Sequence, residues 1–365
     1  MAPPDLERDR NRLIVDLKQG KFTESPNELA RATVVHLRKV VAHGTYTNVN
    51  ELINLIRSEG QQLASARPSE FTVGNMVLRV LKLIREERVR LCSGLDEFPA
   101  DPYDSLHSLW EQQEQTPPAI DRGELKVAII ATLGEFLSEL ECALETIAAQ
   151  APEHIDERDQ LLTLACSSTV QHFLLAAARK RRFRVLIAQN APSNKGDELA
   201  ARLREATGGA ARTDKKDAAR FGGIEVVPDA AVFAVMPQVN KVVLGANAVL
   251  ADGGFIGAAG SYALCLAAQR CSVPVIVVAG FYKMTPKFLS AHDQEHFNVL
   301  CAPQLLPATA SAGLVGRISV YHSTSDYVPP ALVSLYIMQT SANSPSYVYR
   351  LLGEYFHPDD IATSS

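Results

Sequence analysis

Hydrophobic positions recur at helical spacing through the first 150 residues of the chain. The apolar stripe from Ala30 to Val41 keeps this spacing. Ahead of it, Ser25–Glu28 has the pattern of a capping box with proline at the first helical position, and Gly44 follows as a stop signal. Asn48–Glu51 repeats the capping spacing, and Pro68–Glu70 is expected to open a third helix. The pattern therefore predicts several consecutive helices.

The segment 93–122 breaks this pattern because acidic residues and prolines replace the apolar stripe. We expect a long surface loop there, with Trp110 as its one anchor. A further helix follows, with an apolar face from Ile129 to Ile147. Such faces usually pack against one another in a bundle and less often serve as partner surfaces. Residues 1–152 are thus expected to form an N-terminal all-helical domain.

From about His154 the hydrophobic period changes to that of strands alternating with helices. Short β-branched runs predict strands at 161–165, 185–188, 224–227, 242–244 and 273–278. Between them lie helical stretches at 169–179, 197–206 and 229–236, the last one capped by Asp229. The segment 246–260 is expected to be a Gly-rich loop, 327–330 a turn, and 344–356 a final helix.

This alternation predicts an α/β protein in which a Rossmann-like, doubly wound and mostly parallel sheet domain follows the helices. It would occupy residues 153–365, with an exposed loop at about 207–221. In such sheets ligands sit at the carboxyl ends of the strands, here near the segment 246–260.

Composition and charge narrow the function classes. The chain has 365 residues, of which 47% are hydrophobic and 21% charged, and its net charge is −5. This balance gives no broad attraction to nucleic acid or to an anionic membrane. The six cysteines show no CxxC pair and no metal-ligand spacing with histidine, so we expect reduced thiols and no metal site. The polar N-terminal sequence shows no secretory signal, which favours a cytosolic protein.

The candidate chemistry lies in the loops that follow strands. Gly253, Gly254 and Gly257 invite a nucleotide-binding interpretation, but their spacing is not that of the dinucleotide fingerprint. Cys166 lies where a strand runs into a helix, a place where a thiol can be activated. Asn247 cannot exchange a proton at neutral pH, so it cannot act as an acid or a base.

Two further features admit a structural explanation beside a functional one. Asp252 could act as an acid or a base, although an aspartate in a Gly-rich turn more often binds its own backbone. The basic run Arg179–Arg182, followed by Arg184, is typical of the solvated end of a helix, where cations favour the helix dipole. It lacks interleaved aromatic residues, so we do not expect RNA binding, but it could contact protein.

Several segments match a known family. They include PSEFTVGNMVLRVLKLIREE (68–87), TLACSSTVQHFLLAAARKRRFRVLIA (163–188), PDAAVFAVMPQVNKVVLGANAVLADGG (228–254) and SPSYVYRLLGEYFHPDD (344–360). The chain resembles the regulatory subunits of eukaryotic translation initiation factor 2B over nearly its whole length. VGNMV, DYVPP and PSYVYRL with HPDD are similar to the beta branch more than to the alpha or delta branch.

The resemblance extends to sugar-phosphate isomerases of the same fold family. Their catalytic aspartate corresponds here to Asn247, and their Asn-Lys pair to Gly257 and Ala258. Their cysteine falls at Ala165 or, with a slip of one position, at Cys166. Loss of an acid–base group removes a factor of roughly 10²–10⁴ in rate. The resemblance therefore implies a non-catalytic scaffold with a vestigial pocket comprising Cys166, Asn247, Asp252, Gly253 and Gly254.

The resemblance also implies partners. They would be the alpha, delta, gamma and epsilon subunits of the exchange factor, of which epsilon holds the activity, together with initiation factor 2, whose phosphorylated alpha subunit would be sensed. It implies no cofactor. The candidate subunit interface comprises Ser168, His172, Arg179, Arg184, Gly257 and Ser261. Two alternatives stay open, an active aldose–ketose isomerase of this fold and a stand-alone binder of a nucleotide or sugar phosphate.

Overall fold

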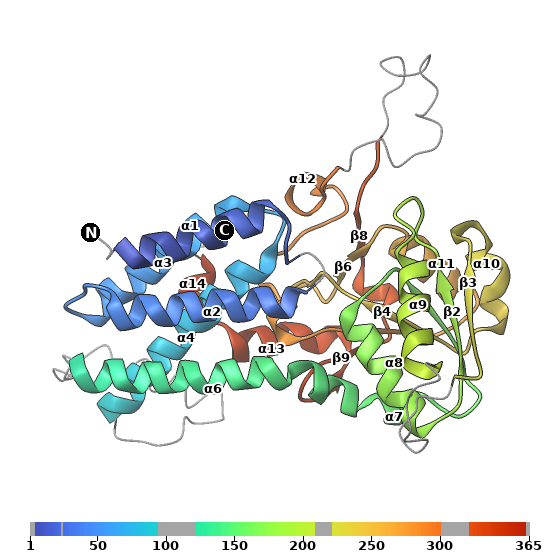
Figure 1. Cartoon of the computed structure of the whole chain (residues 1–365), viewed down its shortest axis with the longest axis horizontal. Coiled ribbons are helices and arrows are strands. Elements are labelled where there is room, and N and C mark those ends of the chain that lie inside the picture. Colours follow the sequence, from blue (N-terminus) through green and yellow to red (C-terminus); the bar gives the residue numbers. More distant parts are fainter. Residues whose placement is uncertain (1–3, 23–24, 94–121, 209–220, 301–320, 363–365) are drawn as a thin grey trace, which may run out of the picture.

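The computed structural model describes residues 4–22, 25–93, 122–208, 221–300 and 321–362. Helices dominate the first part of the chain and a twisted sheet the second, side by side along the long axis of the molecule (Figure 1). The helices of the first part are α1 (Pro4–Lys18), α2 (Pro26–His43), α3 (Val49–Ala66), α4 (Phe71–Ser93), α6 (Arg122–Ala149) and α7 (Ala151–His154). The fold class predicted from the pattern is confirmed.

The predicted capping residues at the helix starts can be compared with the hydrogen bonds in the structure. Asn48 caps α3, because its side-chain oxygen accepts a hydrogen bond of 2.8 Å from the backbone N–H of Glu51. Helix α2 begins at Pro26 as predicted, but the side chain of Ser25 makes no capping bond. Helix α4 begins at Phe71, after the predicted start at Pro68. The predicted loops at 93–122 and 207–221, with Trp110, lie almost entirely outside the described residues.

Seven strands form the main sheet in the order β10-β9-β7-β4-β1-β2-β3, and all neighbours except β10 and β9 are parallel. These strands are β1 (Gln160–Leu164), β2 (Arg184–Ala188), β3 (Gly223–Val227), β4 (Lys241–Gly245), β7 (Val275–Val278), β9 (Leu335–Ile337) and β10 (Ala342–Asn343). The central strands are buried on both faces, as their continuous apolar runs predict.

Helices cover both faces of this sheet (Figure 1). One apolar core joins the sheet to α8 (Ser168–Lys180) and α9 (Lys195–Gly208). The other joins it to α10 (Val232–Val235), α11 (Ser261–Arg270) and α13 (Val348–Tyr355). Short helices α12 (Gln294–Phe297) and α14 (Pro358–Ala362) complete the chain.

Two loop predictions were wrong. The segment 246–260 contains strands β5 (Ala248–Val249) and β6 (Phe255–Ala258), and the predicted turn at 327–330 begins inside strand β8 (Ser325–Val328). These strands pair antiparallel in a second sheet of order β5-β6-β8. The pairing of β6 with β8 joins segments about 70 residues apart, so no local pattern could predict it.

The prediction of one continuous helix over 229–236 was also wrong. Residues 229–231 form a 3₁₀ turn, followed by the single-turn helix α10 and a second 3₁₀ turn. The carboxylate of Asp229 does not cap this segment. It accepts hydrogen bonds of 2.8 and 2.6 Å from the backbone N–H groups of Asn190 and Ala191. Asp229 therefore fixes the loop after β2.

The last described residues return to the helical half, where α14 lies among the first helices (Figure 1) and contacts α4. The carboxylate of Asp360 binds Arg57 of α3 at 2.5 Å and Arg85 of α4 at 3.0 Å. The Tyr355 ring lies under the Arg79 guanidinium, 4.5 Å from its carbon to the ring centre. The chain end thus ties the sheet half to the helices, and the predicted boundary at residue 152 stays a prediction.

Candidate functional site

A small cavity lies where the carboxyl ends of β1 and β4 meet the start of α8. Its volume is about 80 Å³, against roughly 300–1,000 Å³ for ordinary small-molecule sites. It is lined by residues of β1, β4, β6, α8, α9 and α11 and of the adjoining loops, among them Cys166, Ser167, Ser168, Gly245, Asn247, Ser261 and Lys283. This is the position that the strand ends predicted for a ligand.

Cys166 and Asn247 are both in the cavity lining, so the structure brings these two candidates together. Asn247 is exposed, and its backbone N–H donates to the carbonyl of Ile256 at 2.7 Å. Gly245 allows the close approach of β4 to α8, because a Cβ there would stand 2.4 Å from Oγ of Ser167. A glycine at the end of β4 therefore lets Ser167, the residue before α8, lie close to the strand.

Asp252, Gly253 and Gly254 do not line the cavity. They form the turn between β5 and β6, where the carboxylate of Asp252 accepts a hydrogen bond of 2.8 Å from the N–H of Gly254 and one of 2.6 Å from the hydroxyl of Tyr327. The first of these bonds is the backbone role expected for an aspartate in such a turn. Gly253 has φ of +82° and accepts a hydrogen bond from Tyr336, so these residues hold the second sheet together.

The ionisable side chains of the cavity do not form an acid–base pair around Asn247. Among the described lining residues the one carboxylate is Glu198, and it forms an ion pair with Arg202 four residues further along α9. The amide of Asn247 does not ionise near neutral pH, so it cannot act as a general acid or base. The cavity therefore has polar groups to hold a small anion or water but no carboxylate placed for proton transfer.

Lys283 is a cavity residue that the sequence pattern did not reveal. Its side chain is 4% exposed, and its Nζ donates a hydrogen bond of 2.7 Å to the carbonyl of Ala246. Burial lowers the pKa of Lys283 to about 8, with the charge of Glu70 opposing the shift. The one sequence signal for this residue was its place shortly after the apolar run of β7, where a ligand-binding side chain can lie at the end of a strand.

The candidate interface residues do not form one surface. Ser168 and His172 lie in the first half of α8, next to the cavity, and His172 Nδ1 lies 2.7 Å from the carbonyl of Ser168. Arg179 lies at the other end of this helix, about 16 Å away at 1.5 Å per residue. Arg184 begins β2 at that same edge of the sheet.

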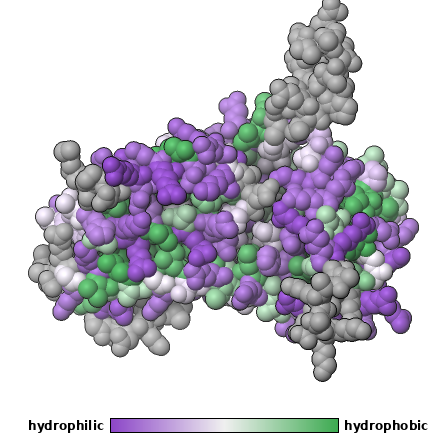
Figure 2. Space-filling view, in the orientation of Figure 1, coloured by the Kyte–Doolittle hydropathy of each residue, from purple (hydrophilic) through white to green (hydrophobic). Residues whose placement is uncertain are grey.

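The other two interface candidates are inside the chain. Gly257 is buried, and Ser261 is 1% exposed. The side chains that reach solvent nearby belong to α10 and α11, where Phe233 is 59%, Tyr262 43% and Leu266 42% exposed. Figure 2 shows hydrophobic surface at the end of the molecule where these two helices lie. Any contact in this region would therefore use the outer face of α11.

The part of the chain that the structure describes holds neither a cluster of metal ligands nor a membrane-spanning helix. No three His, Cys, Asp or Glu side chains there gather closely enough to hold a metal ion. No described helix combines the length and the apolar character that crossing a membrane requires.

Sequence comparisons place the chain beside translation factors. The model of the initiation factor 2 subunit family matches residues 23–345. A translation initiation factor eIF2B subunit beta of Dictyostelium discoideum is 34% identical, and the match covers 95% of each chain. The protein of the same name in Schizosaccharomyces pombe is 29% identical, again over 95% of each chain.

Structural comparisons agree. The crystal structure of eIF2B beta from Chaetomium thermophilum matches with a TM-score of 0.74 at 28% identity, covering 98% of this chain and 94% of the other. A 5-methylthioribose 1-phosphate isomerase of Pyrococcus horikoshii matches with a TM-score of 0.59 at 16% identity, covering 95% of this chain and 87% of the other. The likeness to the isomerase shows a common fold alone.

Proposed function

Because the chain belongs to the initiation factor 2 subunit family, we propose that it is a beta-type regulatory subunit of the exchange factor for translation initiation factor 2. The observation that carries this proposal is the 34% identity to a beta subunit across 95% of both chains, which spans the helical and the sheet halves alike. The cavity supports it, because an amide stands where the isomerases have their aspartate. The subunit would act in the cytosol.

Assembly with a delta-type subunit is the first part of the proposed function. A tetrameric eIF2B-beta2-delta2 complex is known from Chaetomium thermophilum, and its matching chain is 27% identical to this one with a TM-score of 0.68. The exposed Phe233, Tyr262 and Leu266 form an apolar patch on α10 and α11, and contiguous apolar surface of this kind marks protein interfaces. We assign the delta-type contact to this patch.

Regulation is the second part. A phosphoserine on the alpha subunit of initiation factor 2 adds about two negative charges and three acceptor oxygens. A core of beta, delta and alpha subunits that binds the two forms differently couples phosphorylation to exchange by the epsilon subunit. The helical half would contribute to that surface, and the gamma and epsilon subunits would be carried by the same core.

Co-expression with the delta-type subunit of the same organism, followed by native mass spectrometry, tests the assembly. We expect a hetero-oligomer, and we expect Phe233→Asp with Leu266→Asp to abolish it by burying charge in an apolar interface. The control is Val127→Asp, at a 69% exposed position on α6 of the helical half. A chain that stays a monomer in the presence of the delta-type subunit would refute the proposal.

The isomerase alternative is tested directly on the purified chain. Incubation with 5-methylthioribose 1-phosphate is expected to give no ketose product. Turnover that Cys166→Ala abolishes would show that the cavity is catalytic, and the chain would then be an enzyme of this fold.

A further inference from the structure

A groove with a basic lining lies at the edge of the sheet opposite the small cavity. Its volume is about 640 Å³, and it runs between the end of α8, α9 and the first residues of β3. Six basic residues line or adjoin it, and Glu157 is its one acidic lining residue in the described chain; Arg179, Lys180, Arg181, Arg182 and Arg204 line the groove, and Arg184 adjoins it. A local excess of cations on a chain of net charge −5 requires an explanation.

The helix dipole explains only part of this cluster. Arg179 and Lys180 are in the last turn of α8, where a cation stabilises the partial negative charge of the helix end. That effect falls off within the last turn. Arg182 follows the helix, and Arg204 comes from α9, so the cluster gathers cations from separate elements.

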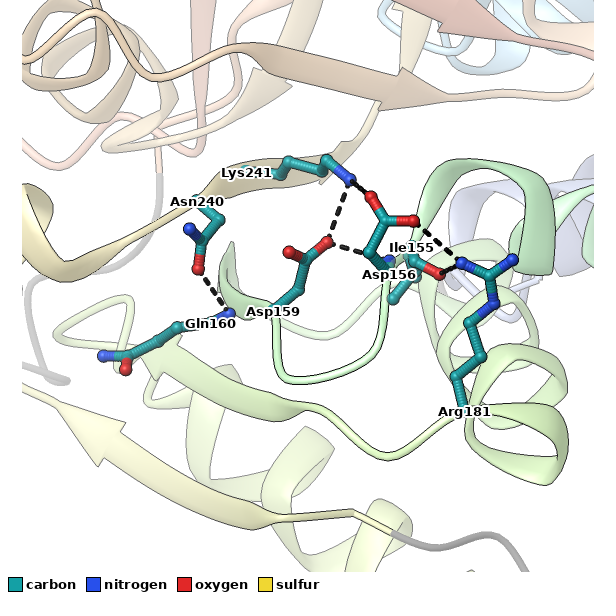
Figure 3. Close-up of polar contacts among 7 residues, drawn as sticks. All are labelled: Ile155, Asp156, Asp159, Gln160, Arg181, Asn240 and Lys241. Atoms are coloured by element: carbon teal, nitrogen blue, oxygen red, sulfur yellow. Dashed lines mark hydrogen bonds and ion pairs between the residues drawn. The ribbon is translucent and has the colours of Figure 1, made fainter.

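Within the basic run, Arg181 has a structural role. Its guanidinium donates hydrogen bonds of 2.8 Å to the carbonyl of Ile155 and to the carboxylate of Asp156 (Figure 3). Lys241 binds Asp156 and Asp159 at 2.8 and 2.9 Å, which fixes the strand starts at this edge. Asp156 and Asp159 are therefore already engaged.

The neighbours of Arg181 have no such partners. Arg179, Lys180 and Arg182 are exposed, and their side chains make no ion pair with any residue that the structure describes. Arg184 faces Glu225 at 3.5 Å, with both side chains 57% exposed, and Arg204 donates to the carbonyl of Ile224. Three cations thus face solvent beside a groove that holds almost no negative charge.

We propose that this groove binds an acidic segment of a partner protein, an extended peptide rich in aspartate, glutamate or phosphorylated residues. Ile224, which is partly exposed, offers the peptide apolar contact beside the cations, and β3 is the edge strand of the described sheet. Complementary charge increases the association rate and selects the partner. The groove also lies apart from the apolar patch on α10 and α11.

Peptide fits the lining better than nucleic acid does. Single-stranded RNA or DNA is held by stacking of bases on exposed aromatic rings. The aromatic ring in this groove is that of Phe221, and it packs edge-on against the buried Phe183, with ring centres 5.3 Å apart. Glu157 and Glu225 at the rim would also repel a continuous phosphate backbone more than a peptide with spaced charges.

The test uses the full chain and a fluorescein-labelled decapeptide of alternating glutamate and glycine, measured by fluorescence anisotropy. We expect saturable binding that weakens as salt rises, because the contact is electrostatic. Arg179→Glu with Arg182→Glu should weaken binding by about tenfold or more. Arg12→Glu with Lys18→Glu makes the same charge change on exposed positions of α1, and it should change binding by less than about twofold.

Each outcome decides the proposal. It is overturned if the wild-type chain does not bind the peptide, if both double variants lose the same affinity, or if oligouridine of equal charge binds more tightly. Arg179→Gln with Arg182→Gln gives an intermediate loss if charge carries the contact. Because peptide binding is measured on the isolated chain, its failure is distinct from a failure to assemble with the delta-type subunit.

Discussion

The two halves of the molecule treat their charged side chains differently. In the helical half, buried charges are paired: Asp360 binds Arg57 and Arg85, and the carboxylate of Glu59 binds Arg10 at 3.1 Å. In the sheet half, Lys283 is buried without a carboxylate in bonding distance among the described residues, and three cations are open to solvent at the basic groove. Paired buried charges fix how the elements dock, whereas unpaired charges mark where a partner or a ligand can contribute.

The largest effect is expected from breaking the pair that docks the chain end. Asp360→Ala leaves two arginines without their partner in a buried site, which typically costs about 3–5 kcal/mol. Urea unfolding measures the loss. The control is Asp359→Ala, because Asp359 is 69% exposed and should matter little. Equal stability of the two variants would show that Asp360 does not dock the chain end.

The buried Lys283 should make stability depend on pH in the alkaline range, in the opposite sense to a lysine whose pKa is raised by paired carboxylates, such as Lys241. The folded pKa of Lys283, about 8, lies below the ordinary value of 10.5, so between these values the unfolded state binds more protons than the folded state. The free energy of unfolding therefore gains a term that rises with pH across this window, by about 3 kcal/mol in total.

Lys283→Met isolates that term, because the methionine side chain is similar in length and does not titrate. The difference in unfolding free energy between wild type and variant should grow in favour of the wild type from pH 8 to pH 10.5. A difference that stays constant over this range would mean that Lys283 titrates normally in the folded chain.

A smaller loss is expected where β4 approaches α8. Gly245→Ala places a Cβ 2.4 Å from Oγ of Ser167, so the start of α8 must shift, at a cost of about 1–3 kcal/mol. Thermal melting measures it, and Ser167→Gly should restore most of the loss by removing the clashing side chain. If the double variant is no more stable than Gly245→Ala alone, the loss does not come from the contact with the Ser167 side chain.

The smallest effect is expected at the open cations. Arg182→Glu should leave the free energy of unfolding within about 0.5 kcal/mol of the wild type, because this exposed side chain has no ion partner in the described chain. Arg181→Glu, one residue away, should destabilise clearly, because it breaks the contacts to Ile155 and Asp156. Similar losses of stability at both positions would show that the contacts of Arg181 stabilise the fold no more than the solvent-exposed side chain of Arg182 does.

The candidate site was only partly predictable. Cys166 and Asn247 follow β1 and β4, and adjacent parallel strands bring their ends together, so their shared cavity follows from the strand pattern. Asp252 also comes after β4 in the chain, but it does not reach the cavity. The pairing of β6 with β8 places it beside Tyr327, whose hydroxyl donates to its carboxylate. Lys283 follows the apolar run of β7, which was a signal, but only the fold shows that its side chain reaches the carbonyl of Ala246 after β4.

The amino-acid sequence by itself determined the succession of helices and buried strands, because the period of apolar residues decides which backbone form can bury them. It also determined family membership, and it showed an amide where the isomerases of this fold have their aspartate. Only the tertiary structure decided that residues 255–258 pair with 325–328, that Asp360 docks on α3 and α4, and that Arg181 is engaged while Arg182 is open. These contacts join distant segments, and a side chain's partner depends on which elements the fold brings beside it.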